Sequence, residues 1–381
     1  RKIRIQHWPQ TIEAVMNRIK SAAKTLAINV AIILTVIGVL VTGPLAVFGA
    51  YDTFRIIFPA LSTDSKIDLP NYDRIDWAGQ YFSDNKRVTF SYSDFVVWKL
   101  DPLSTETINI DENGLRHTVV PETVSSDEIW MFGGSTMFGI GSNDENTIPS
   151  QISEITGIHA MNYAQPGYHA RQSLNELVAL YIDQEESKSV SRTIVFYDGI
   201  NDVLDKCRVD NTGLGTEHEQ QILSALAIKG SSPRVIFMPA LALIRQVRNM
   251  FDRRLFNSGY ICHDDLDRSD RIARSLVNDW RSADAVARQN GDRFIALLQP
   301  VSFLSRTKLD HLDLFREDWK EVARQYDAVY PAIRRYAGEV GFEFHDLSDV
   351  LDHNEFIYID YAHTSPNGNE YVAQEIAKFL P

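Results

Sequence analysis

The stretch "EIWMFGGSTMFGIG", residues 128–141, decides how the chain is organised. Its first residues have the apolar character of a buried strand, and the two glycines that follow end that strand in a sharp turn. Ser135 stands directly after these glycines. A strand that delivers a hydroxyl at a glycine turn can expose a nucleophile, but the same residue types also make ordinary corners. The rest of the chain has to decide between these two interpretations.

From residue 128 onwards, strand-like and helix-like patterns alternate along the chain. Strands are expected at 128–132, 158–163, 193–197, 293–298 and 342–346. Helices are expected at about 148–157, 170–187, 268–290, 319–340 and 367–380. This alternation predicts an α/β fold in which a parallel sheet lies between two layers of helices. Ligands of such sheets bind beyond the carboxyl ends of the strands, and Ser135 lies just past the first one.

The amino-terminal part of the chain predicts a membrane anchor. Residues 25–51 contain no ionisable side chain except the final tyrosine, and this run exceeds the ~20 residues that a membrane-spanning helix needs. A cleaved signal peptide is the alternative, although its apolar region is only about 7–15 residues long. Residues 1–24 carry six basic side chains against one acidic side chain. We therefore expect a basic amphipathic segment over 1–24, on the cytoplasmic side, and a transmembrane helix over 25–51.

The distribution of charge indicates a compartment and a set of partners. Because the basic residues precede the apolar run, the positive-inside rule places the amino end in the cytoplasm and everything after Asp52 in the periplasm or outside the cell. The net charge is −13, which leaves −18 for the chain beyond residues 1–24 with their balance of +5. Such an acidic body would repel nucleic acid. The expected partners are the lipid bilayer and an acylated glycan or lipid substrate. A membrane protein that binds the N-terminal helices is a further partner that the sequence allows.

Two parts of the chain stand apart from the alternating pattern. Residues 52–126 hold strand-like stretches around a Glu-Asn-Gly turn, and they predict a small strand-rich collar or cap. Residues 203–265 form an insertion in the 127–381 domain, and this insertion contains Cys207 and Cys262. Outside the cytoplasm, two cysteines in one insertion favour a disulfide, while a pair of buried free thiols is the alternative.

Four short stretches carry the residue types that catalysis by a nucleophilic serine requires. "FGGSTMFG" supplies Ser135, "NYAQPGYHARQ" supplies Gly167, "YDGINDV" supplies Asn201, and "DYAHTSPNGNEYVAQEI" supplies Asp360 and His363. A serine needs a base to take its proton, and a neutral histidine is suited to that role. An aspartate three residues earlier on the same loop can orient the histidine. Two backbone amides and an asparagine side chain remain as donors to an oxyanion.

The order and spacing of these four blocks resemble the SGNH, or GDSL-type, hydrolase family over residues 128–381. The resemblance implies a flavodoxin-like three-layer α/β/α fold. It also implies that Ser135 is the nucleophile, that His363 is the base and that Asp360 is the orienting acid.

The resemblance further implies an oxyanion hole that consists of Ser135, Gly167 and Asn201. Gly134 departs from the family pattern, which has an aspartate at this position, although a glycine-glycine-serine sequence still gives the turn. No metal and no other cofactor is expected, because the histidines and aspartates of residues 345–353 lack ligand spacing and predict a solvated acidic loop. His169, close to Gly167, is expected at the surface.

The sequence thus predicts a membrane-anchored serine esterase that removes acyl groups, expected to be O-acetyl groups, from a glycan or lipid. The substrate class follows from the expected location and not from any residue. An O-acyltransferase to an extracytoplasmic polysaccharide is an alternative, because the same acyl-enzyme can be resolved by a sugar hydroxyl. A non-catalytic anchored subunit that binds a partner or a glycan is a third possibility.

Overall fold

The computed structural model describes residues 8–57, 65–121, 125–183, 190–211, 213–216, 259–312 and 317–381. These residues fall into two units. One contains the long helix α1 (Trp8–Ile57), and the other is an α/β body that contains all the other described residues.

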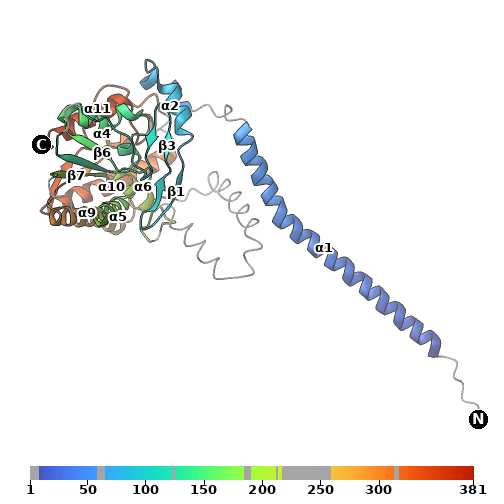
Figure 1. Ribbon diagram of the computed structural model, residues 1–381. Coiled ribbons are helices and arrows are strands. Elements are labelled where there is room, and N and C mark those ends of the chain that lie inside the picture. The colour runs from blue at the N-terminus through green and yellow to red at the C-terminus, as the bar shows by residue number, and fades with distance from the viewer. Residues whose placement is uncertain are drawn as a thin grey trace, which may run out of the picture. The chain divides into compact units, whose positions relative to one another are not determined.

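Helix α1 is apolar enough to cross a membrane over Ala14–Val39 (Figure 1). Its leucines and valines lie exposed along this stretch instead of packing against a core, as at Leu26 and Leu34. The hydroxyls of two threonines donate to backbone carbonyls one turn earlier, from Thr25 to Ser21 and from Thr35 to Ala31. These polar groups are therefore satisfied inside the helix, as a lipid environment demands.

The bounds of α1 differ from those expected. The helix is continuous across residues 24 and 25, so the basic segment and the apolar run form one element. It also continues through Gly43 and Pro44 to Ile57, beyond the expected end at residue 51. At 1.5 Å per residue it is about 75 Å long, which is more than the ~30 Å hydrocarbon core of a bilayer.

The α/β body is built on a parallel five-stranded sheet in the order β6-β5-β7-β8-β9 (Figure 1). Its strands are β5 (Glu128–Gly133), β6 (His159–Asn162), β7 (Arg192–Asp198), β8 (Arg293–Leu298) and β9 (Glu343–Asp346). All four neighbouring pairs are parallel. The predicted α/β fold is confirmed, and this strand order is the flavodoxin-like one.

Helices cover both faces of the sheet (Figure 1). One face carries α4 (Ile148–Thr156) and α11 (Pro366–Ala377), and the other carries α5 (Ala170–Asp183), α9 (Leu266–Gln289) and α10 (Glu317–Gly338). Successive residues of β5 point to opposite faces. Trp130 and Phe132 pack in the core below α5, α9 and α10, whereas Ile129 and Met131 pack in the core below α4 and α11. Both faces are therefore dry, as the continuous apolar strands predict.

Short helical elements follow several strands of the sheet. They are α3 (Ser135–Phe138), η4 (Asp144–Asn146), α6 (Ile200–Lys206) and η6 (Ser302–Leu304). The elements α3 and α6 begin directly after β5 and β7, so they bring Ser135 and Asn201 to the carboxyl edge of the sheet.

The collar contains more helix than the strand-rich collar that was expected. It begins with η2 (Ser65–Asp68), η3 (Pro70–Tyr72) and α2 (Ala78–Asn85). Two short hairpins follow, made of β1 (Phe90–Ser93), β2 (Val97–Leu100), β3 (Leu103–Ser104) and β4 (Asn109–Ile110). In α2 the buried residues Ala78, Tyr81 and Phe82 have the spacing of a helix face. This pattern was present in the sequence and is the physical reason for the helix.

Candidate active site

Three of the predicted side chains form one chain of hydrogen bonds. Ser135 Oγ lies 2.7 Å from His363 Nε2, and His363 Nδ1 lies 2.9 and 2.8 Å from the two carboxylate oxygens of Asp360. A carboxylate can only accept, so Nδ1 carries the proton and Nε2 is the acceptor for the serine hydroxyl. This is the tautomer that a general base for Ser135 requires.

The loop that carries Asp360 and His363 is a tight turn before α11. It is closed by a hydrogen bond from the Ile359 N–H to the His363 carbonyl, at 2.9 Å. Ser365 takes the N-cap position of α11 and Pro366 its first turn, which is where helices tolerate proline. The helix start therefore fixes where the turn ends and holds the histidine at the carboxyl edge of the sheet.

Asp360 is held as a carboxylate by four donors. Oδ1 accepts hydrogen bonds from the N–H groups of Ala362 and His363, at 2.9 and 2.8 Å, and Oδ2 lies 2.6 Å from Lys66 Nζ. Burial by itself would raise the pKa of Asp360. The charge of His363, its hydrogen bonds and the charge of Lys66 outweigh burial, so the pKa lies well below its ordinary value. Asp360 is therefore ionised wherever His363 could act as a base.

The turn that presents Ser135 depends on the absence of a side chain at Gly134. The backbone there is extended, with φ −90° and ψ −154°, which any residue can adopt. However, a Cβ atom at Gly134 would lie 2.4 Å from Asn201 Nδ2. In this structure the amide of Asn201 thus occupies the space that a side chain at position 134 would need.

The three predicted oxyanion-hole residues lie at three neighbouring strand ends. Ser135 follows β5, Gly167 follows β6 with φ +83°, and Asn201 lies in the first turn of α6 after β7. Asn201 Nδ2 donates to the Tyr168 carbonyl at 2.9 Å, and its second N–H remains. In the described part of the chain, neither the Ser135 nor the Gly167 backbone N–H donates a hydrogen bond. These groups are therefore available to a ligand.

Arg116 supports the nucleophile turn from behind, and sequence reasoning missed it. Its side chain is fully buried and donates to the carbonyls of Phe138, Gly139 and Ser142, at 2.9, 3.0 and 2.6 Å. Its Nε donates to Asp144 at 2.9 Å. These carbonyls lie at the last residue of the short helix α3 and in the turn after it, so one guanidinium satisfies the end of the element that begins at Ser135.

Gln299, directly after β8, is a second residue that sequence reasoning missed. Its side-chain nitrogen donates to Thr136 Oγ1 at 2.6 Å, and its side-chain oxygen accepts from the Ile200 N–H at 3.0 Å. Gln299 thereby links the residue after the nucleophile to the helix that carries Asn201. A glutamine in a strand-end loop has no sequence signal for this role, because both of its partners are distant in the chain.

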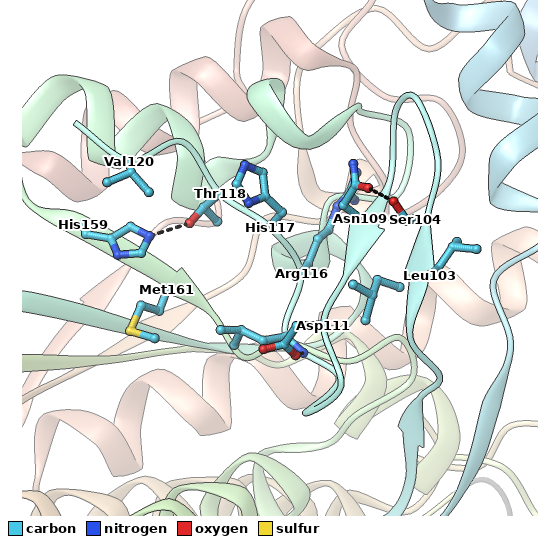
Figure 2. Close-up of a pocket in the computed structure, with 12 residues that line it drawn as sticks. Leu103, Ser104, Asn109, Asp111, Arg116, His117, Thr118, Val120, His159 and Met161 are labelled. Carbon is cyan, nitrogen blue, oxygen red and sulfur yellow. Dashed lines mark hydrogen bonds between the residues drawn. The ribbon is translucent and has the colours of Figure 1, made fainter. Parts of the chain in front are cut away.

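One groove in the described part of the body lies away from these candidate catalytic groups. It measures about 310 Å³ and is lined by residues of 103–120 together with His159 and Met161 (Figure 2). Within it, Thr118 Oγ1 lies 3.1 Å from His159 Nε2. None of Ser135, Asn201 and His363 lines this groove. The geometry of the hydrogen bonds, and not the size of a hollow, locates the candidate active site.

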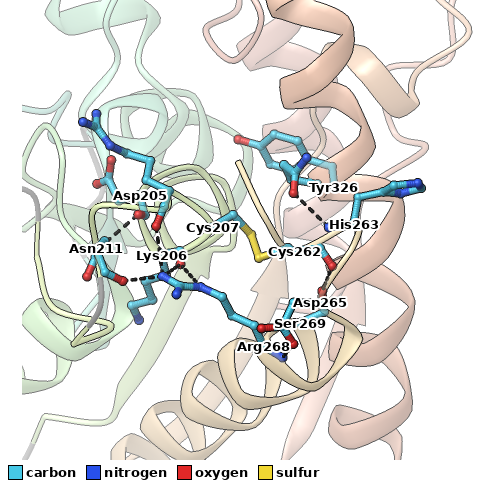
Figure 3. The surroundings of a disulfide bond; sticks show 12 residues. Asp205, Lys206, Cys207, Asn211, Cys262, His263, Asp265, Arg268, Ser269 and Tyr326 are labelled. Carbon is cyan, nitrogen blue, oxygen red and sulfur yellow. Dashed lines mark hydrogen bonds between the residues drawn. A yellow bond between two sulfur atoms is a disulfide. The ribbon is translucent and has the colours of Figure 1, made fainter. Parts of the chain in front are cut away.

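Cys207 and Cys262 are joined in a disulfide between the end of α6 and the segment before α9 (Figure 3). Both sulfurs are buried. Beside them, the Arg268 guanidinium donates to the backbone carbonyls of Lys206, Arg208 and Asn211. Residues 217–258 of the insertion lie outside the described part of the chain, and the disulfide connects the described segments on either side of it.

His169 is buried and not at the surface, so that expectation was wrong. Its Nε2 lies 2.8 Å from Asp205 Oδ2, in a polar cluster below the strand ends. In the same cluster Asp202 accepts from the Ala170 N–H, at the start of α5, and pairs with Lys206 at 2.5 Å. The sequence alone did not place His169 inward, because its partner lies 36 residues away.

The histidines and acids of residues 345–353 do not converge. His345 stacks on Phe379 and His353 stacks on Tyr371. Within the described ranges, no group of three or more histidine, cysteine, aspartate or glutamate side chains is placed to hold a metal ion.

Comparison with known proteins gave matches among solved structures. No protein-family model matches the chain, and no curated protein does. A lipolytic G-D-S-L family protein from Veillonella parvula is 13% identical, with a TM-score of 0.40, and 67% of this chain covers 98% of it. A carbohydrate acetylesterase family member from Sinorhizobium meliloti is 13% identical, with a TM-score of 0.38 and coverages of 67% and 97%. A putative G-D-S-L lipolytic protein from Desulfitobacterium hafniense is 11% identical, with a TM-score of 0.37 and coverages of 66% and 99%.

The strand order of the sheet and the hydrogen bonds at its carboxyl edge can now be considered together. A serine after the first strand of the parallel sheet contacts a histidine and an aspartate that precede the last helix. The fold is an α/β sheet with helices on both faces, and its carboxyl edge carries one serine, histidine and aspartate set.

Proposed function

We propose that this protein is a membrane-anchored serine esterase that acts through an acyl-enzyme. The observation that carries the proposal is the continuous set of hydrogen bonds from Ser135 through His363 to Asp360. An isolated serine hydroxyl is a poor nucleophile, and a correctly protonated histidine within hydrogen-bond distance is what activates it.

In the proposed acylation step, Ser135 Oγ attacks the ester carbonyl while its proton passes to His363 Nε2. The carbonyl oxygen becomes an oxyanion, and the Ser135 and Gly167 amides with the Asn201 side chain would stabilise its charge. When the tetrahedral intermediate collapses, the alcohol leaves with the proton from His363. Asp360 stays ionised and stabilises the imidazolium in between.

In the proposed second step, water attacks the acyl-serine and gives its proton to His363. The tetrahedral intermediate then releases the carboxylic acid, and Ser135 regains its proton. A sugar hydroxyl in place of water would make the same chemistry an O-acyl transfer. We place hydrolysis first, because no feature of the chain is known to exclude water.

The proposed substrate is an acyl group, expected to be O-acetyl, on a glycan or lipid at the outer face of the membrane. The support is the location: α1 has the length and composition of a membrane span, and basic residues precede it. The topology can be tested by adding a protease to intact spheroplasts. Digestion of the α/β body before the membrane is lysed supports the proposed orientation, and protection of the body would contradict it.

Labelling with a fluorophosphonate tests the enzyme proposal without knowledge of the substrate. We expect the full chain in detergent to be labelled once, at Ser135, and the Ser135→Ala variant not to be labelled. Hydrolysis of p-nitrophenyl acetate should be lost in the same variant. An unlabelled, inactive protein would instead favour a non-catalytic binding subunit. Release of free acetate against transfer to an added oligosaccharide would then separate an esterase from a transferase.

A further inference from the structure

A lysine far from the catalytic residues in the sequence contacts the catalytic aspartate. Lys66 lies in η2, a short way along the chain after α1 ends at Ile57, and its Nζ is 2.6 Å from Asp360 Oδ2. The other three donors to Asp360 come from its own loop, at Ala362 and His363. Within the described residues, Lys66 is thus the donor to this carboxylate that comes from a separate element.

The segment that carries Lys66 is fastened to the catalytic loop by further contacts. Asn71 Nδ2 donates to the Phe356 carbonyl at 2.5 Å, and Tyr72 OH donates to the Gly141 carbonyl at 2.7 Å. Tyr72 is buried in the same core as Ile357 and Ile359, two neighbours of Asp360. The backbone of this segment is therefore fixed against the Asp360 loop, and the contact of Lys66 is not that of a free surface side chain.

Two other titratable side chains near this loop, among the described residues, contact different groups. His311 Nε2 lies 2.7 Å from the Tyr358 carbonyl, and Lys308 lies over the Phe356 ring. The charges that act on Asp360 are those of His363, from its own loop, and of Lys66.

We propose that Lys66 is a positioning residue of the active site, which fixes the Asp360 carboxylate toward His363 and sets the pH range in which His363 serves as base. This inference rests on the proposed serine-esterase function. Lys66 Nζ contacts Asp360 Oδ2, and the same carboxylate oxygen contacts His363 Nδ1, so the proposed route of its effect is through Asp360.

The direction of the effect follows from charge. Asp360 stabilises the imidazolium form of His363, and a cation on the other side of the same carboxylate opposes that stabilisation. Removal of the cation leaves the carboxylate charge to the imidazolium alone, so His363 would be protonated over a wider acid range.

The test is the pH profile of the rate at which a fluorophosphonate labels Ser135 in the full chain in detergent. We expect Lys66→Met to move the acid limb of this profile to higher pH, by on the order of one pH unit. Lys66→Arg retains the cation and should keep the limb near its wild-type position. Labelling of Lys66→Met at the alkaline plateau would show that this variant is folded.

Lys99→Met is the matched control. Lys99 also lies in the collar, is about as exposed as Lys66, and makes a 2.7 Å ion pair with a carboxylate, Glu176, that is not part of the catalytic set. Its profile should superimpose on that of the wild type. A Lys66→Met profile that superimposes on the wild type would overturn the proposed role of Lys66, and so would equal shifts in the two methionine variants. Neither result would affect the serine-esterase proposal. A wild-type chain that is not labelled at any pH would overturn the serine-esterase proposal as well.

Discussion

The two parts of the proposed catalytic set, the turn with Ser135 and the loop with Asp360 and His363, are held in different ways. The turn that carries Ser135 rests on groups inside the body: the Arg116 side chain is 0% exposed, and its partner Asp144 is 10% exposed. The loop that carries Asp360 and His363 is held at the edge, where the exposed fractions of the Lys66, Asp360 and His363 side chains are 32%, 23% and 15%. One support is buried, and the other remains in contact with water.

This difference predicts two kinds of mutational effect. A buried charge that loses its partner is left desolvated and uncompensated. Substitution of Arg116, which contacts the Ser135 turn, should therefore lower the free energy of unfolding. A partly exposed ion pair contributes little to stability because water competes with it. Substitution of Lys66, which contacts Asp360, should instead change the rate of reaction at Ser135 and the pH dependence of that rate.

The largest effect should be common to both parts, because the nucleophile and its base act as one unit. We expect Ser135→Ala and His363→Ala each to lower kcat/KM for p-nitrophenyl acetate by about 10⁴- to 10⁶-fold. The double variant should lose little more than either single variant. Steady-state kinetics with a urea-unfolding control would show whether the fold is retained. Effects of the two single variants that multiply in the double variant would contradict a shared mechanism.

The next largest effect should be on stability, and it tests the buried contacts of Arg116 with the Ser135 turn. Arg116→Met takes the buried cation away from Asp144, which keeps only its two neutral donors from Asn109, and it removes one donor from each of three backbone carbonyls. We expect it to cost about 3–5 kcal/mol in the free energy of unfolding. The measurement is the urea-unfolding curve followed by circular dichroism.

Arg293→Met is the control for that measurement. Arg293 pairs with Glu343 through two nitrogens, but the two side chains are 42% and 32% exposed. Its loss should cost about 0–1 kcal/mol. If the two arginine variants unfold at the same urea concentration, the Ser135 turn does not depend on buried contacts.

A smaller effect on activity is expected at Gly134, which lies between the Ser135 turn and the Asn201 side chain. Gly134→Ala would place a Cβ 2.4 Å from Asn201 Nδ2, so it should displace that side chain. We expect it to lower kcat about as much as Asn201→Ala, by ~10²–10³, which corresponds to about 3–4 kcal/mol. Because both changes remove the same donor, the double variant should resemble the single ones.

Gly338→Ala controls for a generic glycine effect, since nothing lies within 4 Å of a Cβ at that position. Full activity in Gly134→Ala would mean that the Asn201 side chain can move aside without losing its proposed role as an oxyanion donor.

The central sheet was largely predictable from the sequence. Strands expected at 128–132 and 293–298 are observed at Glu128–Gly133 and Arg293–Leu298. Strands buried on both faces give continuous apolar runs that are easy to locate. The contact among Ser135, His363 and Asp360 could be predicted because the proposed chemistry needs particular residue types at strand ends and before the last helix. Their convergence follows from the geometry of a parallel sheet.

The residues that support the site could not be found in the same way. Lys66 and Asp360 are 294 positions apart, and Gln299 and Thr136 are 163 positions apart. Lysine, arginine and glutamine are common surface residues, so nothing in the local pattern distinguishes the ones that contact the active site. Only the packing of the collar and strand ends brings them there.

The smallest effect should be that of Lys66 on stability, in contrast with its effect on reactivity. At neutral pH we expect Lys66→Met to change the free energy of unfolding by about 1 kcal/mol or less, because the pair is partly exposed. The pKa of Asp360 in the folded protein lies below its ordinary value. Its ionisation therefore stabilises the fold above about pH 4. This stability is lost as the pH falls through the folded pKa.

Removal of Lys66 takes away one cause of the lowered pKa of Asp360, so acid unfolding of Lys66→Met should begin at slightly higher pH than in the wild type. An acid titration followed by circular dichroism, with Lys99→Met alongside, measures this. A loss of several kcal/mol at neutral pH in Lys66→Met would place Lys66 with Arg116 as a structural support. The distinction between Arg116, as a buried support of the Ser135 turn, and Lys66, as a partly exposed support of the Asp360 loop, would then be wrong.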